Sequence, residues 1–231
     1  MKKFIAIILM LVVMCSSFCV VGYADYKDSY YAFDDELKTY TQELCEEYEV
    51  PYSLVIAIMY HESRFKPDVG TKYVGLMQVG TTKDINAFLK NQNEEAFGHV
   101  YNLYDPKTNI LAGVTILKKD IESSKTLEEA MCKYACGEAN YAKRMRMGSG
   151  YCKPSREIIE IMHEYEDIIE YDFLKNKLEH EKEHYHELMR ESEIHGESFN
   201  EFYEFAISNS FEVINFLTNE IAKYEMEDYN G

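Results

Sequence analysis

One apolar helical segment constrains the fold of this chain more than any other part of it. The segment reads LVIAIMYHESRF and spans Leu54 to Phe65, with apolar side chains at almost every position of its first two turns. At 3.6 residues per turn, Glu62 falls on the same face as Ile58 and Met59. The pattern therefore predicts a helix that carries a carboxylate on its apolar side.

Helical patterns dominate the rest of the chain as well. Residues 68–80 are rich in glycine, which predicts a loop or a short hairpin after the breakers Pro67 and Gly70. Gly137 is expected to end one helix and Ser155 to cap another. The helices expected besides 54–65 span residues 35–47, 82–90, 108–121, 127–136, 155–169 and 199–224. The expected fold class is all-α (mostly helical).

The first 24 residues are typical of a secretory signal peptide. Lys2 and Lys3 precede an apolar run, and Gly22 and Ala24 offer the small residues at which a signal peptidase cleaves. The alternative is an uncleaved membrane anchor, since the run is nearly long enough to span a bilayer. We expect cleavage, export to the cell wall or the exterior, and no membrane insertion of the mature chain.

The remaining chain is expected to form a domain at 25–170 and an acidic helical extension at 171–231, with a break near His195. From Arg156 to Gly231 there are 6 Lys and Arg against 21 Asp and Glu, a net charge of −15 out of −17 for the whole chain. An acidic surface argues against nucleic acid and anionic lipid as partners. The extension is expected to be a solvated helical hairpin that packs its Phe, Leu and Ile stripe on the domain, and a protein partner for it is an open alternative.

Four cysteines follow the expected cleavage site, at positions 45, 132, 136 and 152. In an exported protein they could form disulfides with any of three connectivities, or stay as buried free thiols. Their spacing matches no common zinc pattern, so metal binding by cysteine is not expected.

The chemistry of a carboxylate on an apolar face depends on its hydration. Apolar neighbours remove water from Glu62 and so favour its neutral, protonated form. A protonated acid is what cleavage of a glycosidic bond needs, because the leaving oxygen must receive a proton. The alternative is structural: Glu62 could pair with an arginine such as Arg64, Arg144 or Arg156.

Four motifs in the chain, taken in order, bear on this choice. They are HESRF at residue 61, YVGLMQV at 73, LYDPKTNILAGVTIL at 103 and KYACG at 133. In this order and spacing they resemble the soluble lytic transglycosylase (SLT) domain, the goose-lysozyme-like module of glycoside hydrolase family 23. The resemblance covers about residues 37–169. It implies a helical, lysozyme-like fold, and peptidoglycan glycan strands as substrate.

The resemblance also implies roles for single residues. Glu62 matches the sole catalytic acid/base of the family, which needs no cofactor and forms a 1,6-anhydromuramic acid product. Ser63, Met77, Gln78 and Tyr134 match residues that line the substrate cleft. Three of the four also have a structural alternative: a hydroxyl bonded to the helix backbone for Ser63, core packing for Met77, and a buried, satisfied hydroxyl for Tyr134.

The chain departs from the family where Ala135 and Cys136 replace the usual Asn-Ala. Two alternatives to the transglycosylase therefore stay open: a hydrolytic muramidase on the same fold, and a catalytically inactive wall-binding or assembly protein.

The sequence HEKEH, from His180 to His184, matches the zinc-protease pattern H-E-x-x-H. Its central residues are charged, where zinc proteases usually keep uncharged ones. No clear third ligand follows. The prediction is therefore that this segment is a solvated acidic face and holds no catalytic metal.

Overall fold

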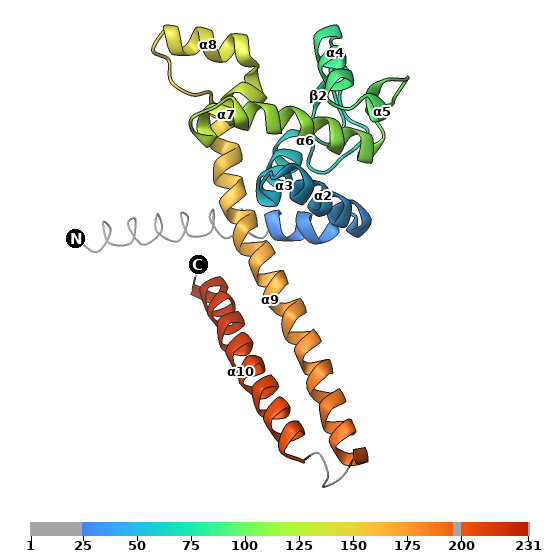
Figure 1. The fold of residues 1–231 in the computed structure, drawn as a ribbon. Coiled ribbons are helices and arrows are strands. Elements are labelled where there is room, and N and C mark those ends of the chain that lie inside the picture. Colours follow the sequence, from blue (N-terminus) through green and yellow to red (C-terminus); the bar gives the residue numbers. More distant parts are fainter. Residues whose placement is uncertain (1–24, 196–199, 231) are drawn as a thin grey trace, which may run out of the picture. The chain divides into compact units, whose positions relative to one another are not determined.

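The computed structural model describes residues 25–195 and 200–230, and these residues form two compact units that divide at Glu166 and Asp167. The expected signal peptide lies outside the described residues. Apart from a two-stranded hairpin, the regular structure there is helical, which confirms the expected fold class (Figure 1). None of the helices in the described part of the chain has the length and hydropathy of a membrane span.

The first unit contains a helical segment at residues 25–32, and then labelled elements as far as the start of α9. These are α2 (Asp35–Tyr48), α3 (Tyr52–Ser63), β1 (Tyr73–Val74), β2 (Val79–Gly80), α4 (Lys83–Gln92), α5 (Glu94–Phe97), α6 (Pro106–Glu122), α7 (Leu127–Cys136) and α8 (Glu138–Arg146). Strands β1 and β2 pair antiparallel, Tyr73 with Gly80 and Val74 with Val79. Helix α9 spans Lys153–His195 and α10 spans Asn200–Asn230.

Helix α3 is the core of the first unit. Every residue from Leu54 to Tyr60 is buried, so the helix has no solvent face along two turns. A helix that is apolar all round must be enclosed by others. Helix α6 contacts α2, α4, α7 and β2, and Figure 1 shows it running between the α4–α5 region and α2–α3. Helix α2 packs on α3, and Tyr26 of the segment 25–32 and Tyr165 of α9 contact the ring of Tyr60, so these elements help to enclose α3.

Local signals set most helix starts as the sequence predicts. The side chain of the preceding residue accepts a hydrogen bond from a backbone N–H of the first turn in five helices. The five capping residues are Asp34, Thr82, Asn93, Asp105 and Thr126. These bonds satisfy donors that a helix start otherwise leaves unpaired.

Two helix ends differ from the expectation. Helix α3 stops at Ser63 rather than Phe65, because Arg64 and Phe65 adopt left-handed backbone angles. Their side chains hold them there: the Arg64 guanidinium lies 3.9 Å from the centre of the Tyr60 ring, and Phe65 stacks on Phe33 at 4.6 Å. Helix α9 starts at Lys153, so Ser155 lies inside it and donates to the carbonyl of Cys152 instead of capping the helix.

Helix α8 was not expected, and α9 was expected to end near residue 169. Gly137, with φ +81°, ends α7 as predicted, but the chain starts a new helix at once. Helix α9 continues to His195 because no Gly or Pro interrupts the sequence from 155 to 195. The expected break near His195 agrees with the end of α9, whereas Gly196 lies outside the described residues.

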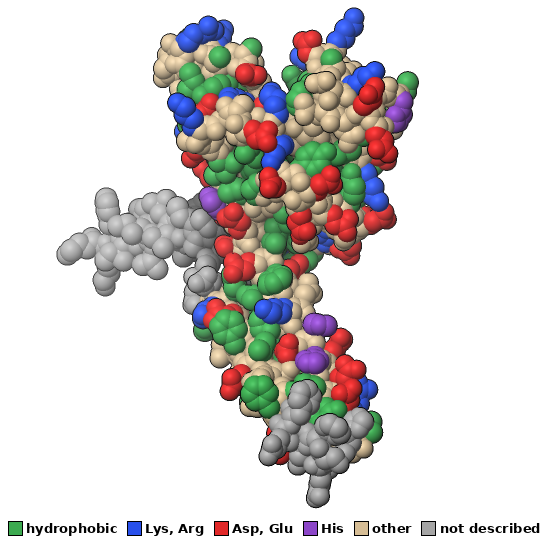
Figure 2. Space-filling model, in the orientation of Figure 1, with side chains coloured by type: hydrophobic (Ala, Val, Ile, Leu, Met, Phe, Trp, Pro, Cys, Tyr) green, Lys and Arg blue, Asp and Glu red, His purple; other side chains and the backbone are tan. Residues whose placement is uncertain are grey.

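The second unit is a hairpin of the later part of α9 and helix α10. Its small core consists of Leu178, Leu217 and Ile221, bordered by Tyr171 and Ile214. Figure 2 shows hydrophobic side chains at the surface of this hairpin among acidic ones. The apolar stripe expected in the extension therefore packs the two helices against each other.

A core substitution in α3 tests its central place. Replacing Ile56, which is fully buried, with Ala is expected to lower the free energy of unfolding by about 2–5 kcal/mol, because it leaves a cavity. Urea unfolding followed by circular dichroism measures this change. The matched control is Val100→Ala at a position 97% exposed, where a change below about 0.5 kcal/mol is expected. Equal effects at the two positions would contradict the burial of α3.

Candidate active site

Glu62 lies in the last turn of α3, where the buried helix reaches the surface. Its side chain is 23% exposed, between the fully buried Leu54–Tyr60 stretch and the left-handed turn at Arg64. The acid therefore belongs to the most rigidly enclosed element of the unit and still reaches solvent.

The carboxylate of Glu62 is oriented by a chain of polar side chains. His61 Nδ1 lies 3.1 Å from Glu62 Oε1, and His61 Nε2 lies 3.6 Å from Glu157 Oε2 of helix α9. A histidine held between two carboxylates has a fixed ring orientation. The sequence analysis missed His61 and Glu157. The pair His61-Glu62 was visible in the sequence, but the contact with residue 157 depends on the tertiary fold.

The charge on His61 follows from these neighbours. The hydrogen bond to Glu62 raises the pKa of His61 above its ordinary value, against the opposing effect of burial, and Glu157 adds a smaller increase. The imidazole therefore keeps its proton to higher pH than a free histidine does.

The hairpin turn between β1 and β2 is fixed by a single buried amide. Asn109 of α6 donates from Nδ2 to the carbonyls of Val74 and Leu103, each at 2.8 Å, and its Oδ1 accepts from the N–H of Met77 at 2.8 Å. Asn109 is fully buried, so no water competes for these bonds. The turn is thereby held against α6.

Two glycines allow this close approach. A Cβ on Gly75 would lie 2.2 Å from Asn109 Nδ2, and a Cβ on Gly113 would lie 2.3 Å from the sulfur of Met77. Gly75 also has φ +77°, which disfavours other residues. Motif positions Gly75, Asn109 and Gly113 thus act together, although Gly75 lies more than 30 residues from the other two.

Tyr134 of α7 connects the turn to the surroundings of Glu62. Its hydroxyl donates to the Met77 carbonyl at 3.0 Å. Burial raises the pKa of Tyr134 well above its ordinary value, and the negative charges of Glu62 and Asp120 raise it further. The hydroxyl therefore stays a neutral donor at physiological pH.

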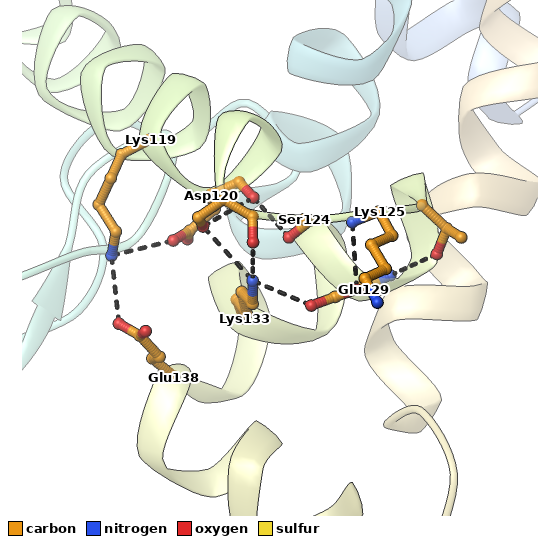
Figure 3. Close-up of polar contacts among 9 residues, drawn as sticks. Lys119, Asp120, Ser124, Lys125, Glu129, Lys133 and Glu138 are labelled. Carbon is orange, nitrogen blue, oxygen red and sulfur yellow. Dashed lines mark hydrogen bonds and ion pairs between the residues drawn. The ribbon is translucent and has the colours of Figure 1, made fainter.

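The corner between α6 and α7, which positions Tyr134, is braced by a buried lysine. Lys133 Nζ donates to the carbonyl of Ser123 at 2.6 Å and lies 3.1 Å from a carboxylate oxygen of Glu129 (Figure 3). A carbonyl at a helix C-terminus lacks an intrahelical partner, and an ammonium group satisfies it. The lysine thus joins the end of α6 to α7.

The other residues that the sequence predicted as substrate-binding mainly contact groups of the protein itself. Ser63 Oγ donates to the Met59 carbonyl of its own helix, and Gln78 Nε2 donates to the carbonyl of Gly75 at 2.9 Å. Met77 is fully buried. These three residues shape the turn and the helix end, and their contact with substrate stays a prediction.

Left-handed backbone angles gather at this site. Among the described residues, the non-glycine positions with positive φ are Glu49, Arg64, Phe65 and Gln78. Three of the four lie directly after Glu62-Ser63 or in the hairpin turn. Such conformations persist only where the surrounding structure holds them, and they are frequent at functional sites.

An open pocket of about 610 Å³ lies beside the hairpin, bordered by Val74, Thr81 and the segment 97–104. Its polar and aromatic lining includes Asn86, Lys90, His99, Tyr101 and Tyr104. Amide and hydroxyl groups can exchange hydrogen bonds with a sugar, and the rings offer flat apolar surface. Glu62 does not line this pocket.

The HEKEH segment lies on α9 within the second unit. His180 and His184 are exposed, and Glu181 accepts a hydrogen bond from Ser210. In the part of the chain that the structure describes, no third histidine, cysteine or carboxylate joins them as a metal-ligand group.

Comparison with known families adds one finding. Residues 39–150 match the family model described as the transglycosylase SLT domain. The matched range contains Glu62, the hairpin turn, Asn109 and Tyr134. A search of curated proteins found no match.

The role of Asn109 leads to a stability prediction. Asn109→Ala leaves one buried N–H and two buried carbonyls without their partner, so a loss of about 2–4 kcal/mol in unfolding free energy is expected. Urea unfolding provides the measurement, with Asn91→Ala on the exposed face of α4 as the control. A loss no larger than that of the control would mean that the amide does not hold the turn.

The polar chain at Glu62 leads to a titration prediction. Glu62→Gln is expected to lower the pKa of His61, and Glu157→Gln to lower it less, because Glu62 contributes the larger increase. NMR of the histidine ring protons across pH measures both. By linkage, a raised histidine pKa stabilises the fold below the unfolded-state pKa, and this stabilisation is lost as pH rises through the folded-state value. A His61 pKa unchanged in Glu62→Gln would refute the contact.

Proposed function

We propose that the protein is an exported enzyme that cleaves peptidoglycan glycan strands with Glu62 as its acid/base, because residues 39–150 match the transglycosylase SLT domain. An SLT domain implies transglycosylase-type activity related to peptidoglycan. The observation that supports the finer proposal is the position of Glu62 in the last turn of a helix that is buried from Leu54 to Tyr60, close enough to Tyr134 for its charge to raise the pKa of that residue.

The proposed reaction needs one carboxyl group. Protonated Glu62 gives its proton to the glycosidic oxygen as the bond from C1 of N-acetylmuramic acid to the oxygen of N-acetylglucosamine breaks. The C6 hydroxyl oxygen of the same muramic acid then bonds to C1, and the Glu62 carboxylate takes the hydroxyl proton. The product carries a 1,6-anhydro ring and no water is consumed. The enzyme returns to its protonated form without a second carboxylate, unlike the two-carboxylate glycosidases.

The carboxyl group of Glu62 must alternate between a neutral and a charged form. His61, which also lies against Glu157, is 3.1 Å from the Oε1 atom of Glu62 and can donate a hydrogen bond to the charged form. The neutral hydroxyl of Tyr134 is committed to the Met77 carbonyl and so fixes the turn that faces the sugar. We propose that the aromatic pocket beside the hairpin receives a neighbouring sugar of the glycan strand.

Two features outside the domain complete the proposal. Cleavage of the expected signal peptide at residues 1–24 would deliver the enzyme to the cell wall, where peptidoglycan lies. The acidic hairpin would repel acidic wall polymers, and a cationic protein partner would relieve this repulsion.

The test is mass spectrometry of fragments released from purified peptidoglycan. The protein is expected to release fragments that end in 1,6-anhydromuramic acid, and Glu62→Gln to release them at least about 100-fold more slowly. Asp68→Asn and Asp84→Asn, which alter the next acids along the chain, serve as matched controls and should keep full activity.

Each other outcome identifies a different function. Fragments with reducing ends would indicate a hydrolytic muramidase on the same fold. Full activity in Glu62→Gln would remove Glu62 from the mechanism. No release by any variant, with retained binding to peptidoglycan, would favour an inactive wall-binding protein.

A further inference from the structure

Three cysteines that are distant or irregularly spaced in the sequence meet in the first unit. Cys132 and Cys136 lie one turn apart on α7, and Cys152 directly precedes α9. Their three sulfur atoms all lie within 4.8 Å of one another, and the first two are 3.6 Å apart. The fourth cysteine, Cys45, is buried in α2 and takes no part.

The separations suit a shared metal ion. Zinc bonded tetrahedrally to thiolates at about 2.3 Å sets its sulfur ligands about 3.8 Å apart. A disulfide requires its two sulfurs at about 2.05 Å, so a cysteine pair in this cluster would have to move closer together. The Cys132 and Cys136 sulfurs thus lie near the separation that a tetrahedral zinc ion sets, and the third sulfur lies within 4.8 Å of both.

The surroundings of the cluster hold it in place. The N–H of Cys152 donates to the sulfur of Cys132 at 3.2 Å, and Arg144 donates to the carbonyls of residues 149, 150 and 151. The Arg144 bonds fix the loop that ends at Cys152.

The cluster is accessible from one side. Cys132 and Cys152 are buried, whereas Cys136 is partly exposed and borders an open pocket with Asn140, Lys143 and Arg144. An ion could enter there, and a water molecule could take the fourth position. Three thiolates around a divalent ion leave one negative charge, which the two cationic side chains at the pocket would offset.

We propose that Cys132, Cys136 and Cys152 form a three-thiolate site for a soft or borderline metal ion of the zinc type. Thiolate ligands select such ions over magnesium or calcium. The ion would join α7, which carries Tyr134, to the start of α9, which carries Glu157, so it would stabilise two elements of the candidate active site. The spacing of the cysteines in the sequence argued against a cysteine-bound metal, whereas the fold brings the three sulfur atoms close together.

The test is a titration of the purified, reduced protein with Zn²⁺, and with Co²⁺ as a spectroscopic probe. One ion per chain is expected, with release of protons, thiolate-to-cobalt absorption bands, and protection of three thiols from alkylation. Cys136→Ser and Cys152→Ser should each weaken binding about ten-fold or more. Cys136 is partly exposed, so its variant should fold, and circular dichroism checks this.

Matched variants separate this site from others. Cys45→Ala should bind the ion like the unaltered protein, and so should His180→Ala, which removes a histidine of the HEKEH segment. Zinc binding that survives Cys136→Ser and Cys152→Ser unchanged would overturn the proposal. So would a disulfide between two of the three cysteines in the protein purified without reductant, because it would leave a single thiol.

Discussion

The burial of helix α3 is the constraint on which the rest of the first unit depends. A helix without a polar face between Leu54 and Tyr60 can exist only inside a shell, and the surrounding helices supply that shell. Since the helix cannot rotate or slide without exposing apolar surface, its last turn has a fixed position. The position of Glu62 is fixed with that turn. His61 contacts the carboxylate of Glu62, and Glu157 contacts His61, so these contacts set the orientation of the carboxylate.

The second organising contact is polar. Asn109 closes the hairpin turn onto α6 from inside the core, and two glycines give it the space to do so. Tyr134 then reaches the same turn from α7. Residues from three separate motifs therefore meet because one amide replaces the hydrogen bonds that water would otherwise make with the turn.

Local patterns in the sequence were enough to predict most helices of the first unit and the hairpin. Apolar periodicity marks α2, α6 and α7, and glycine marks the turn. The end predicted for α3 was wrong because the residues there take a conformation that depends on distant contacts, such as the stacking of Phe65 on Phe33. The limits predicted for α9 were also wrong. Helix α8 lacks an apolar face, since none of its residues is buried, so periodicity had nothing to detect.

The residues of the candidate site also separate into those that local motifs indicate and those that only the fold brings together. Glu62, Met77 and Tyr134 could be named in advance because their motifs are local. The sequence did not predict the contacts of His61 with Glu157 or of Cys152 with Cys132. These contacts depend on how α3 and α7 lie against the start of α9, which no local pattern indicates. The sequence predicted Glu62 on the single apolar face of a helix. The helix is instead buried on every side over two turns, and Glu62 lies where it reaches the surface.

The contact between Met77 and Gly113 has a consequence for oxidative chemistry. The sulfur of Met77 occupies space so close to α6 that even a methyl group on Gly113 would overlap it, and the side chain has no exposed surface. Oxidation to the sulfoxide adds a polar oxygen to that sulfur. The folded turn has no room for this oxygen, so an oxidant can damage Met77 only after the turn has left α6.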